Sequence, residues 1–144
     1  MKIISWNCQG LGRTLTVKNL KDMVKKFRPS VIFLMETKMR AEKVAKVRTK
    51  CGFINEIVVE PRGLAGGLTV WWLDNVSLQV LVKTQNIIHV LVNSDGQNIP
   101  RLISFVYGPP KEGERRVVWN TLRRLATNVE VSWLVTGDFN DLLS

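Results

Sequence analysis

The hydrophobic period of the sequence changes in the middle of the chain. Up to residue 52, short apolar runs typical of strands alternate with apolar residues spaced three and four apart, which are typical of helices. Four strand-like segments then follow one another with only short polar turns between them, at residues 67–73, 78–83, 87–92 and 102–107. A helix and a last strand at 131–135 complete the order. Because the middle strands lack crossover helices, this order excludes a simple doubly wound nucleotide-binding fold. It favours a mixed sheet, or two packed sheets, with outer helices.

Individual elements can be placed from their apolar residues. A first strand at 2–6 is followed by a helix that ends at Pro29. Val31–Met35 is predicted to be a strand covered on both faces, because all five residues are apolar. A short second helix is predicted before Gly52. The short polar connections between the four middle strands favour antiparallel hairpins.

The charge of the chain indicates anionic partners. Its 144 residues include 21 Lys and Arg against 12 Asp and Glu, a net charge of +9, which favours nucleic acid first and an acidic membrane second. No stretch approaches the length of a membrane span, and the N-terminus does not resemble a signal peptide, so we expect an intracellular protein with reduced cysteines. Neither a dinucleotide-binding glycine motif nor a P-loop is present, so no nucleotide cofactor is expected.

Polar residues that suit metal and phosphate chemistry stand at the predicted strand ends. These are Asn7, Glu36, Tyr107, Asp138 and Asn140. A carboxylate and an amide oxygen, completed by waters, suit Mg²⁺. Asp138 could orient or deprotonate a water molecule while Asn140, two residues further along a turn, donates to a phosphate oxygen.

Each of these signals also has a purely structural explanation. An Asp-Phe-Asn turn commonly bonds to its own backbone, Glu36 could cap the following helix, and Tyr107 could simply reach solvent at a strand exit. Basic clusters at 25–28, 115–116 and 123–124 are typical of solvated helix faces, although they could also contact phosphates.

Taken together, four motifs resemble the endonuclease/exonuclease/phosphatase superfamily. They are Ser-Trp-Asn at 5–7, Met-Glu-Thr at 35–37, Val-Tyr-Gly-Pro at 106–109 and Gly-Asp-Phe-Asn at 137–140. The segment Trp-Asn-Cys-Gln-Gly-Leu-Gly at 6–12 looks most like the endonuclease domains of LINE-type non-LTR retrotransposons, especially those of plants. The resemblance implies an α/β (α+β) fold, a DNase I-like four-layer α/β/β/α sandwich of two mixed sheets. It also implies divalent-metal-dependent hydrolysis of DNA phosphodiesters with Mg²⁺ or Mn²⁺.

The resemblance also assigns roles to the residues at the strand ends. It makes Glu36 the metal carboxylate and Asn7 a nearby metal ligand or phosphate contact. Tyr107 would contact the scissile phosphate, Asp138 would activate the attacking water, and Asn140 would hold the phosphate. Since DNA lies across the strand ends in this family, the basic residues that follow these motifs are the expected substrate contacts: Arg13, Lys38, Arg40 and Lys111.

One departure from the family pattern bears on activity. The family continues beyond the Gly-Asp-Phe-Asn motif to an Asp-His pair, whereas the single histidine of this sequence, His89, lies in a mid-chain strand where no family motif matches, and is expected to be a sheet-surface residue. We therefore expect residues 1–144 to be the N-terminal part of one such domain, incomplete at its C-terminus. Such a fragment would bind DNA weakly, show little or no nicking, and self-associate through an uncovered sheet surface. If functional, it would be nuclear.

Two other interpretations remain open. The first is a non-catalytic, basic remnant that binds nucleic acid. The second is a phosphatase acting on a small phosphorylated substrate, which the basic charge and the retroelement-like motifs disfavour.

Overall fold

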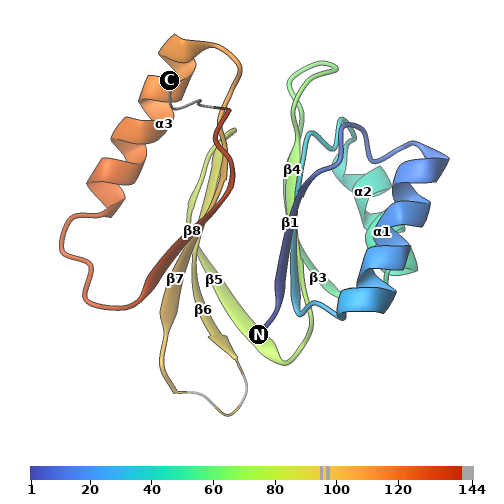
Figure 1. The fold of residues 1–144 in the computed structure, drawn as a ribbon, viewed down its shortest axis with the longest axis horizontal. Helices are drawn as coiled ribbons and strands as arrows, with labels where there is room; N and C mark the ends of the chain where they lie inside the picture. Colours follow the sequence, from blue (N-terminus) through green and yellow to red (C-terminus); the bar gives the residue numbers. More distant parts are fainter. Residues whose placement is uncertain (95, 97, 141–144) are drawn as a thin grey trace. The chain divides into compact units, whose positions relative to one another are not determined.

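The computed structural model describes residues 1–94, 96 and 98–140. The chain divides into two compact units, an N-terminal unit of residues 1–76 and a C-terminal unit of residues 77–144, and each contains one four-stranded sheet (Figure 1).

The N-terminal unit alternates strands and helices before it ends in a strand pair. Its elements are β1 Ile3–Asn7, α1 Thr14–Phe27, β2 Val31–Met35, α2 Ala41–Lys50, β3 Asn55–Val59 and β4 Leu68–Trp72. The strand order is β1-β2-β4-β3, with β1 parallel to β2 and β4 antiparallel to both of its neighbours. The sheet is therefore mixed, and all five residues of β2 are buried, as the sequence predicts.

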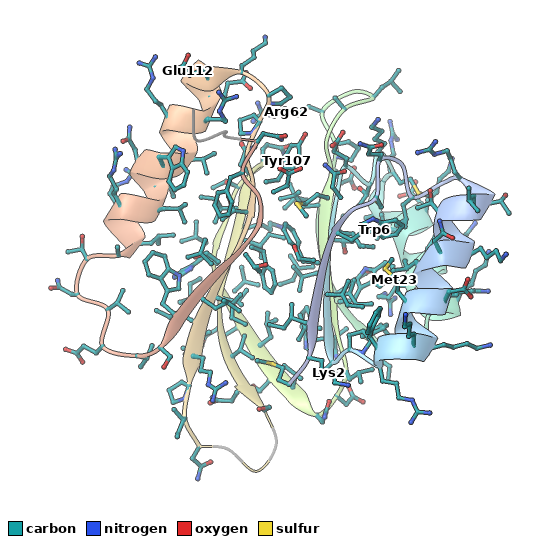
Figure 2. The ribbon with its side chains drawn as sticks, viewed as in Figure 1. Lys2, Trp6, Met23, Arg62, Tyr107 and Glu112 are labelled. Atoms are coloured by element: carbon teal, nitrogen blue, oxygen red, sulfur yellow. The ribbon has the colours of Figure 1, made fainter. Side chains whose placement is uncertain are left out.

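Helices α1 and α2 pack side by side on the same face of this sheet (Figure 1). The apolar core beneath them includes Leu20 from α1, Val44 from α2 and Leu34 from β2, none of which is exposed to solvent. Trp6 and Met23 pack against this core, and Figure 2 shows both in the layer between β1 and α1. Burial of these side chains fixes both helices relative to the ends of β1 and β2.

The C-terminal unit contains the second sheet and one helix. Its elements are β5 Val76–Lys83, which begins at the unit boundary, β6 Ile87–Ser94, β7 Arg101–Tyr107, α3 Glu112–Leu125 and β8 Trp133–Asp138. The strand order is β5-β6-β7-β8, with β6 antiparallel and β8 parallel to β7. Val118 and Leu122 of α3 pack against Ile87 and Val106 of the sheet. This sheet is also mixed, and the crossover helix α3 connects its two parallel strands.

The observed elements correct the sequence-based expectations in three places. Strand β3 was not predicted. The connection after β4 is not a hairpin, since β4 and β5 belong to different sheets. The last strand does not span 131–135 but Trp133–Asp138, so Asp138 ends a strand instead of lying on a turn. The overall class, two mixed sheets with flanking helices, agrees with the prediction. None of the helices in the described part of the chain is long and apolar enough to cross a membrane.

Candidate active site

Asn7 and Glu36 meet at the ends of two neighbouring parallel strands. Asn7 is the last residue of β1 and lies opposite Met35 of β2, so Glu36 follows directly beside it. The amide Nδ2 of Asn7 donates a hydrogen bond to Oε2 of Glu36 at 2.5 Å, and Oδ1 of Asn7 accepts one from the backbone N–H of Gln9 at 3.3 Å. Within this unit, the structure therefore brings the side chains of Asn7 and Glu36 together.

The backbone around Glu36 is held in an uncommon conformation. Glu36 has a φ of 54° and Lys38 a φ of 55°, both in the left-handed region that side chains rarely adopt. The carbonyl of Glu36 accepts from Gly10 N at 2.8 Å, and Thr37 N donates to the carbonyl of Gly67 at 3.1 Å. A Cβ at Gly67 would collide with Oγ1 of Thr37, so only glycine fits there. These bonds to two other loops hold the carboxylate at a fixed place on the sheet edge.

Two of the four predicted substrate contacts line a pocket with this carboxylate, and a third lines the pocket next to it. Arg13 and Lys38 line an open pocket of about 550 Å³ together with Glu36. The guanidinium of Arg13 also donates to the carbonyl of Gln9 at 2.8 Å. Arg40 lines an adjoining pocket that Arg13 and Lys38 share. The fourth residue, Lys111, lies in the other unit, where it is the exposed N-cap of α3.

Tyr107, Asp138 and Asn140 form a second group, in the C-terminal unit. Tyr107 and Asp138 are register partners at the ends of the parallel strands β7 and β8, and Gly108 N donates to the carbonyl of Asp138 at 2.6 Å. Oδ1 of Asp138 accepts from Asn140 N at 3.0 Å, and the amide of Asn140 donates to the carbonyl of Gly108. A primary amide carries two N–H groups, so this bond does not use up the donor capacity of Asn140. Figure 2 labels Tyr107 at the upper end of this sheet and Glu112 at the upper end of α3.

Close packing holds the Gly-Asp-Phe-Asn segment in place. Gly137 has a φ of 141°, and a Cβ there would collide with the carbonyl of Val106 on β7. Phe139 stacks on Trp119 of α3, with ring centroids 5.4 Å apart and planes 12° from parallel. The polar residues on either side of Phe139 are therefore anchored to both the sheet and the helix.

Supporting residues in this unit were not identified from the sequence. Asn86, which the sequence assigns only to a turn, makes two hydrogen bonds with the backbone of Tyr107. Its carbonyl accepts from Tyr107 N at 2.8 Å, and its side-chain amide donates to the carbonyl of Tyr107 at 2.9 Å. Arg115, assigned only to a basic cluster, donates to the carbonyl of Pro110 at 2.5 Å. Neither contact is local to one predicted element, so residue type alone gave no signal for it.

His89 takes no part in either group. It is buried, with 3% of its surface exposed, and its Nδ1 lies 2.6 Å from Oγ of Ser104. The expectation of a sheet-surface position is wrong, because the indole of Trp133 covers the ring edge-on and bonds to the same Ser104 hydroxyl. Desolvation by burial lowers the pKa of His89 below its usual 6.5.

Cys8 follows Asn7 directly but lacks the character of a nucleophile. The thiol is buried and donates to the carbonyl of Met35 at 3.3 Å. Burial raises its pKa to about 11, so the thiolate is scarce at neutral pH. Both cysteines are free thiols, as expected from the sequence.

The oxygen donors of the N-terminal group suit a hard cation. Glu36 offers a carboxylate and Asn7 an amide oxygen, which with waters form the ligand set that Mg²⁺ accepts. Among the described residues, no three His, Cys, Asp or Glu side chains gather as a metal cluster. A cation here would thus rely on one carboxylate and several waters, which fits Mg²⁺ or Mn²⁺ better than a zinc-type site.

Sequence and structure comparisons assign the chain to a known family. The profile of the endonuclease/exonuclease/phosphatase family matches residues 4–143, which include all five residues of the two groups. The chain belongs to this family. Members of the family are hydrolases that act on phosphodiester bonds. A search of curated protein sequences gives no significant match.

Solved structures of family proteins share the fold of the chain. TDP2 from D. rerio, complexed with a single-strand DNA product, matches with a TM-score of 0.65 and 20% identity, over 98% of this chain and 61% of that one. The AP endonuclease LMAP from Leishmania major matches with a TM-score of 0.65 and 15% identity, over 94% and 54%. The 3′ phosphatase NExo from Neisseria, bound to a product DNA hairpin, matches with a TM-score of 0.64 and 17% identity, over 97% and 58%.

These matches cover most of this chain but only part of each structure. The chain spans between 47% and 67% of the length of the solved structures that it matches. The similarity to these structures establishes the fold, a DNase I-like arrangement of two mixed sheets with flanking helices.

Proposed function

We propose that the chain belongs to a divalent-metal-dependent DNA endonuclease of the retroelement type, and that the Asn7–Glu36 group and the Tyr107–Asp138–Asn140 group serve one hydrolytic reaction. The observation that carries the proposal is the bonded Asn7–Glu36 pair at the ends of β1 and β2 in a chain of this family. A rigidly mounted carboxylate beside an amide is what a magnesium-dependent phosphodiesterase needs on its metal side.

Glu36 would hold Mg²⁺ or Mn²⁺, with Asn7 as a further ligand or a phosphate contact. When bound, the cation stabilises negative charge on the phosphoryl oxygens. Asn7 fixes the carboxylate through its 2.5 Å bond to Oε2, and Arg13 and Lys38 in the same pocket attract the DNA backbone.

The second group would serve the attacking water and the phosphate. Asp138 orients the water and takes its proton, because an acidic side chain at a fixed strand end is a suitable base. Asn140 donates to a phosphate oxygen, and Tyr107 contacts the scissile phosphate from the neighbouring strand end. Lys111, four residues after Tyr107, adds positive charge on the same side of that sheet.

Charge and motif wording support DNA and a retroelement endonuclease. The net charge of +9 favours a polyanionic substrate over a small phosphorylated molecule. Two of the matched solved structures, TDP2 from D. rerio and NExo from Neisseria, hold product DNA. The segment at 6–12 resembles plant LINE-type endonuclease domains. If the chain acts on chromosomal DNA in this way, its place of action is the nucleus.

The buried His89 favours a second candidate for residues 1–144 taken alone, a nucleic-acid-binding chain with little catalysis. The family motif that carries a catalytic histidine has no counterpart in these residues. The hydrogen bond between His89 and Ser104 and the edge-on contact of His89 with the Trp133 ring tie the histidine to the interior. A positioned acid or base typically contributes about 10²–10⁴-fold in rate. We therefore expect the 144-residue chain to hydrolyse DNA slowly at best.

Nicking of supercoiled plasmid tests the proposal. We compare the chain with a version extended by a family-like Ser-Asp-His segment, in Mg²⁺ and in EDTA. The extended protein should nick with Mg²⁺ only, the unextended chain should be at least about 100-fold slower, and Glu36→Gln and Asp138→Asn should each remove nicking. Arg116→Gln, an exposed site on α3, is the control that retains it. Nicking that survives Glu36→Gln would refute the metal assignment. Fast nicking by the unextended chain, abolished by Asp138→Ala, would refute the importance given to the missing histidine.

A further inference from the structure

Two rows of lysines face a groove on the outer side of the N-terminal unit. Lys18, Lys21 and Lys25 follow one another at spacings of three and four along α1, and α2 carries a matching row. That row consists of Lys43, Lys46 and Lys50. Residues at these spacings share one face of a helix, and the two helices lie side by side on the sheet (Figure 1). All six side chains are exposed.

The groove between the two rows of lysines has a volume of about 660 Å³. The buried side chains of Leu11 and Val47 contribute apolar lining, and Thr14 and Met39 also line it. Its far end continues into a smaller pocket lined by Lys25 and Asp22, which is the single acidic residue among those that line the two pockets. None of the six lysines forms an ion pair with a described carboxylate. Their mutual repulsion is therefore relieved best by an anion that lies along the groove.

The groove is continuous with the pocket of Glu36. It shares Gly12, Met39 and Lys43 with a neighbouring pocket that Arg13, Lys38 and Arg40 also line. That pocket in turn shares Arg13 and Lys38 with the Glu36 pocket. A cationic path thus runs from the candidate metal carboxylate, over the loops after β1 and β2, and along the two helices.

We propose that this α1–α2 groove binds the phosphate backbone of a nucleic-acid strand whose scissile phosphate lies at Glu36. The inference rests on the proposed function for the identity of the ligand. Each lysine row spans about 10 Å at the helical rise, which is about the axial length of three nucleotides in one strand of B-DNA, at about 3.4 Å each. The path leads to the candidate hydrolytic residues instead of ending on a flat face. A strand of nucleic acid can lie along the whole path and reach Glu36, which a flat membrane surface cannot do, so the path favours nucleic acid.

Fluorescence anisotropy with a labelled single-stranded oligonucleotide of about 20 nucleotides, in EDTA, tests the proposal. The groove variant combines Lys21→Gln, Lys46→Gln and Lys50→Gln. The matched control combines Lys26→Gln, Lys83→Gln and Arg116→Gln, which removes the same charge from exposed sites outside the groove. Binding is measured over a range of salt concentrations, and thermal unfolding verifies that all proteins are folded.

The salt dependence gives the decisive result. Loss of three phosphate contacts on a single strand should reduce the slope of log K against log salt by about 2 and weaken binding by about 10–100-fold at 0.1 M salt. The control should keep the wild-type slope. Equal slopes for the two variants would overturn the proposal. It would also be overturned if the groove variant lost binding to anionic phosphatidylserine vesicles while its oligonucleotide binding stayed unchanged. Because binding is measured without metal, failure of the proposed hydrolysis appears separately, as absent nicking with the groove effect intact.

Discussion

At the scale of single residues, His89 makes the stability of the protein depend on pH. Burial lowers its pKa below 6.5 in the folded chain, whereas the unfolded chain takes up a proton near 6.5. Unfolding is therefore favoured progressively as the pH falls below 6.5, by up to about 1.4 kcal/mol per pH unit. Urea unfolding at pH 7.5 and 5.0 should show this loss in the wild type and a smaller one in His89→Gln. An identical pH dependence in both proteins would contradict the buried, neutral histidine.

Residue types predicted the chemistry of the candidate site better than they predicted the contacts that hold the site in place. Glu36 and Asn7 could be associated from the sequence because their motifs resemble those of the family. The role proposed for Asn140 likewise comes from its motif. The positive φ of Glu36, and the contact of Asn86 with Tyr107, could not be predicted, because they depend on bonds between loops that are distant in sequence.

At the scale of elements, the pairing of β7 with β8 depends on Gly137. A side chain there would strike the carbonyl of Val106, and its φ of 141° is unfavourable for any other residue. We expect Gly137→Ala to lower the free energy of unfolding by at least about 2 kcal/mol. Gly113→Ala on α3 is the control, since open space surrounds that position, and it should be neutral or stabilising by up to about 1 kcal/mol. Chemical denaturation measures both, and equal effects would refute the close approach.

Strong periodicity made most elements predictable. Val31–Met35 is an uninterrupted run of apolar residues, and the apolar residues of α1 recur at helical spacing. Strand β3 escaped prediction because Asn55 and Glu56 give it a polar start and only Val59 is buried. The assignment of β4 and β5 to different sheets also has no local signal, since Asp74 and Asn75 would equally suit a hairpin turn.

At the scale of the whole molecule, net charge predicted an anionic partner but not where it binds. The α1–α2 groove requires that two helices separated by β2 lie side by side, which is information that only the fold supplies. The strand β8 lies at the edge of its sheet, and Leu134 on it is 49% exposed. An exposed edge strand of this kind can pair with another chain. The self-association through uncovered sheet surface that we expect from the sequence stays a prediction.

The central claim is that the Asn7–Glu36 group and the Tyr107–Asp138–Asn140 group serve one hydrolytic reaction. The most direct measurement is paramagnetic line broadening by Mn²⁺ in the NMR spectrum of the labelled protein. Mn²⁺ should broaden the amide signals of Lys38 and also those of Tyr107 and Asn140, and Glu36→Gln should remove both effects. Broadening confined to the surroundings of Glu36, with the signals of Tyr107 and Asn140 unchanged, would contradict a single hydrolytic site.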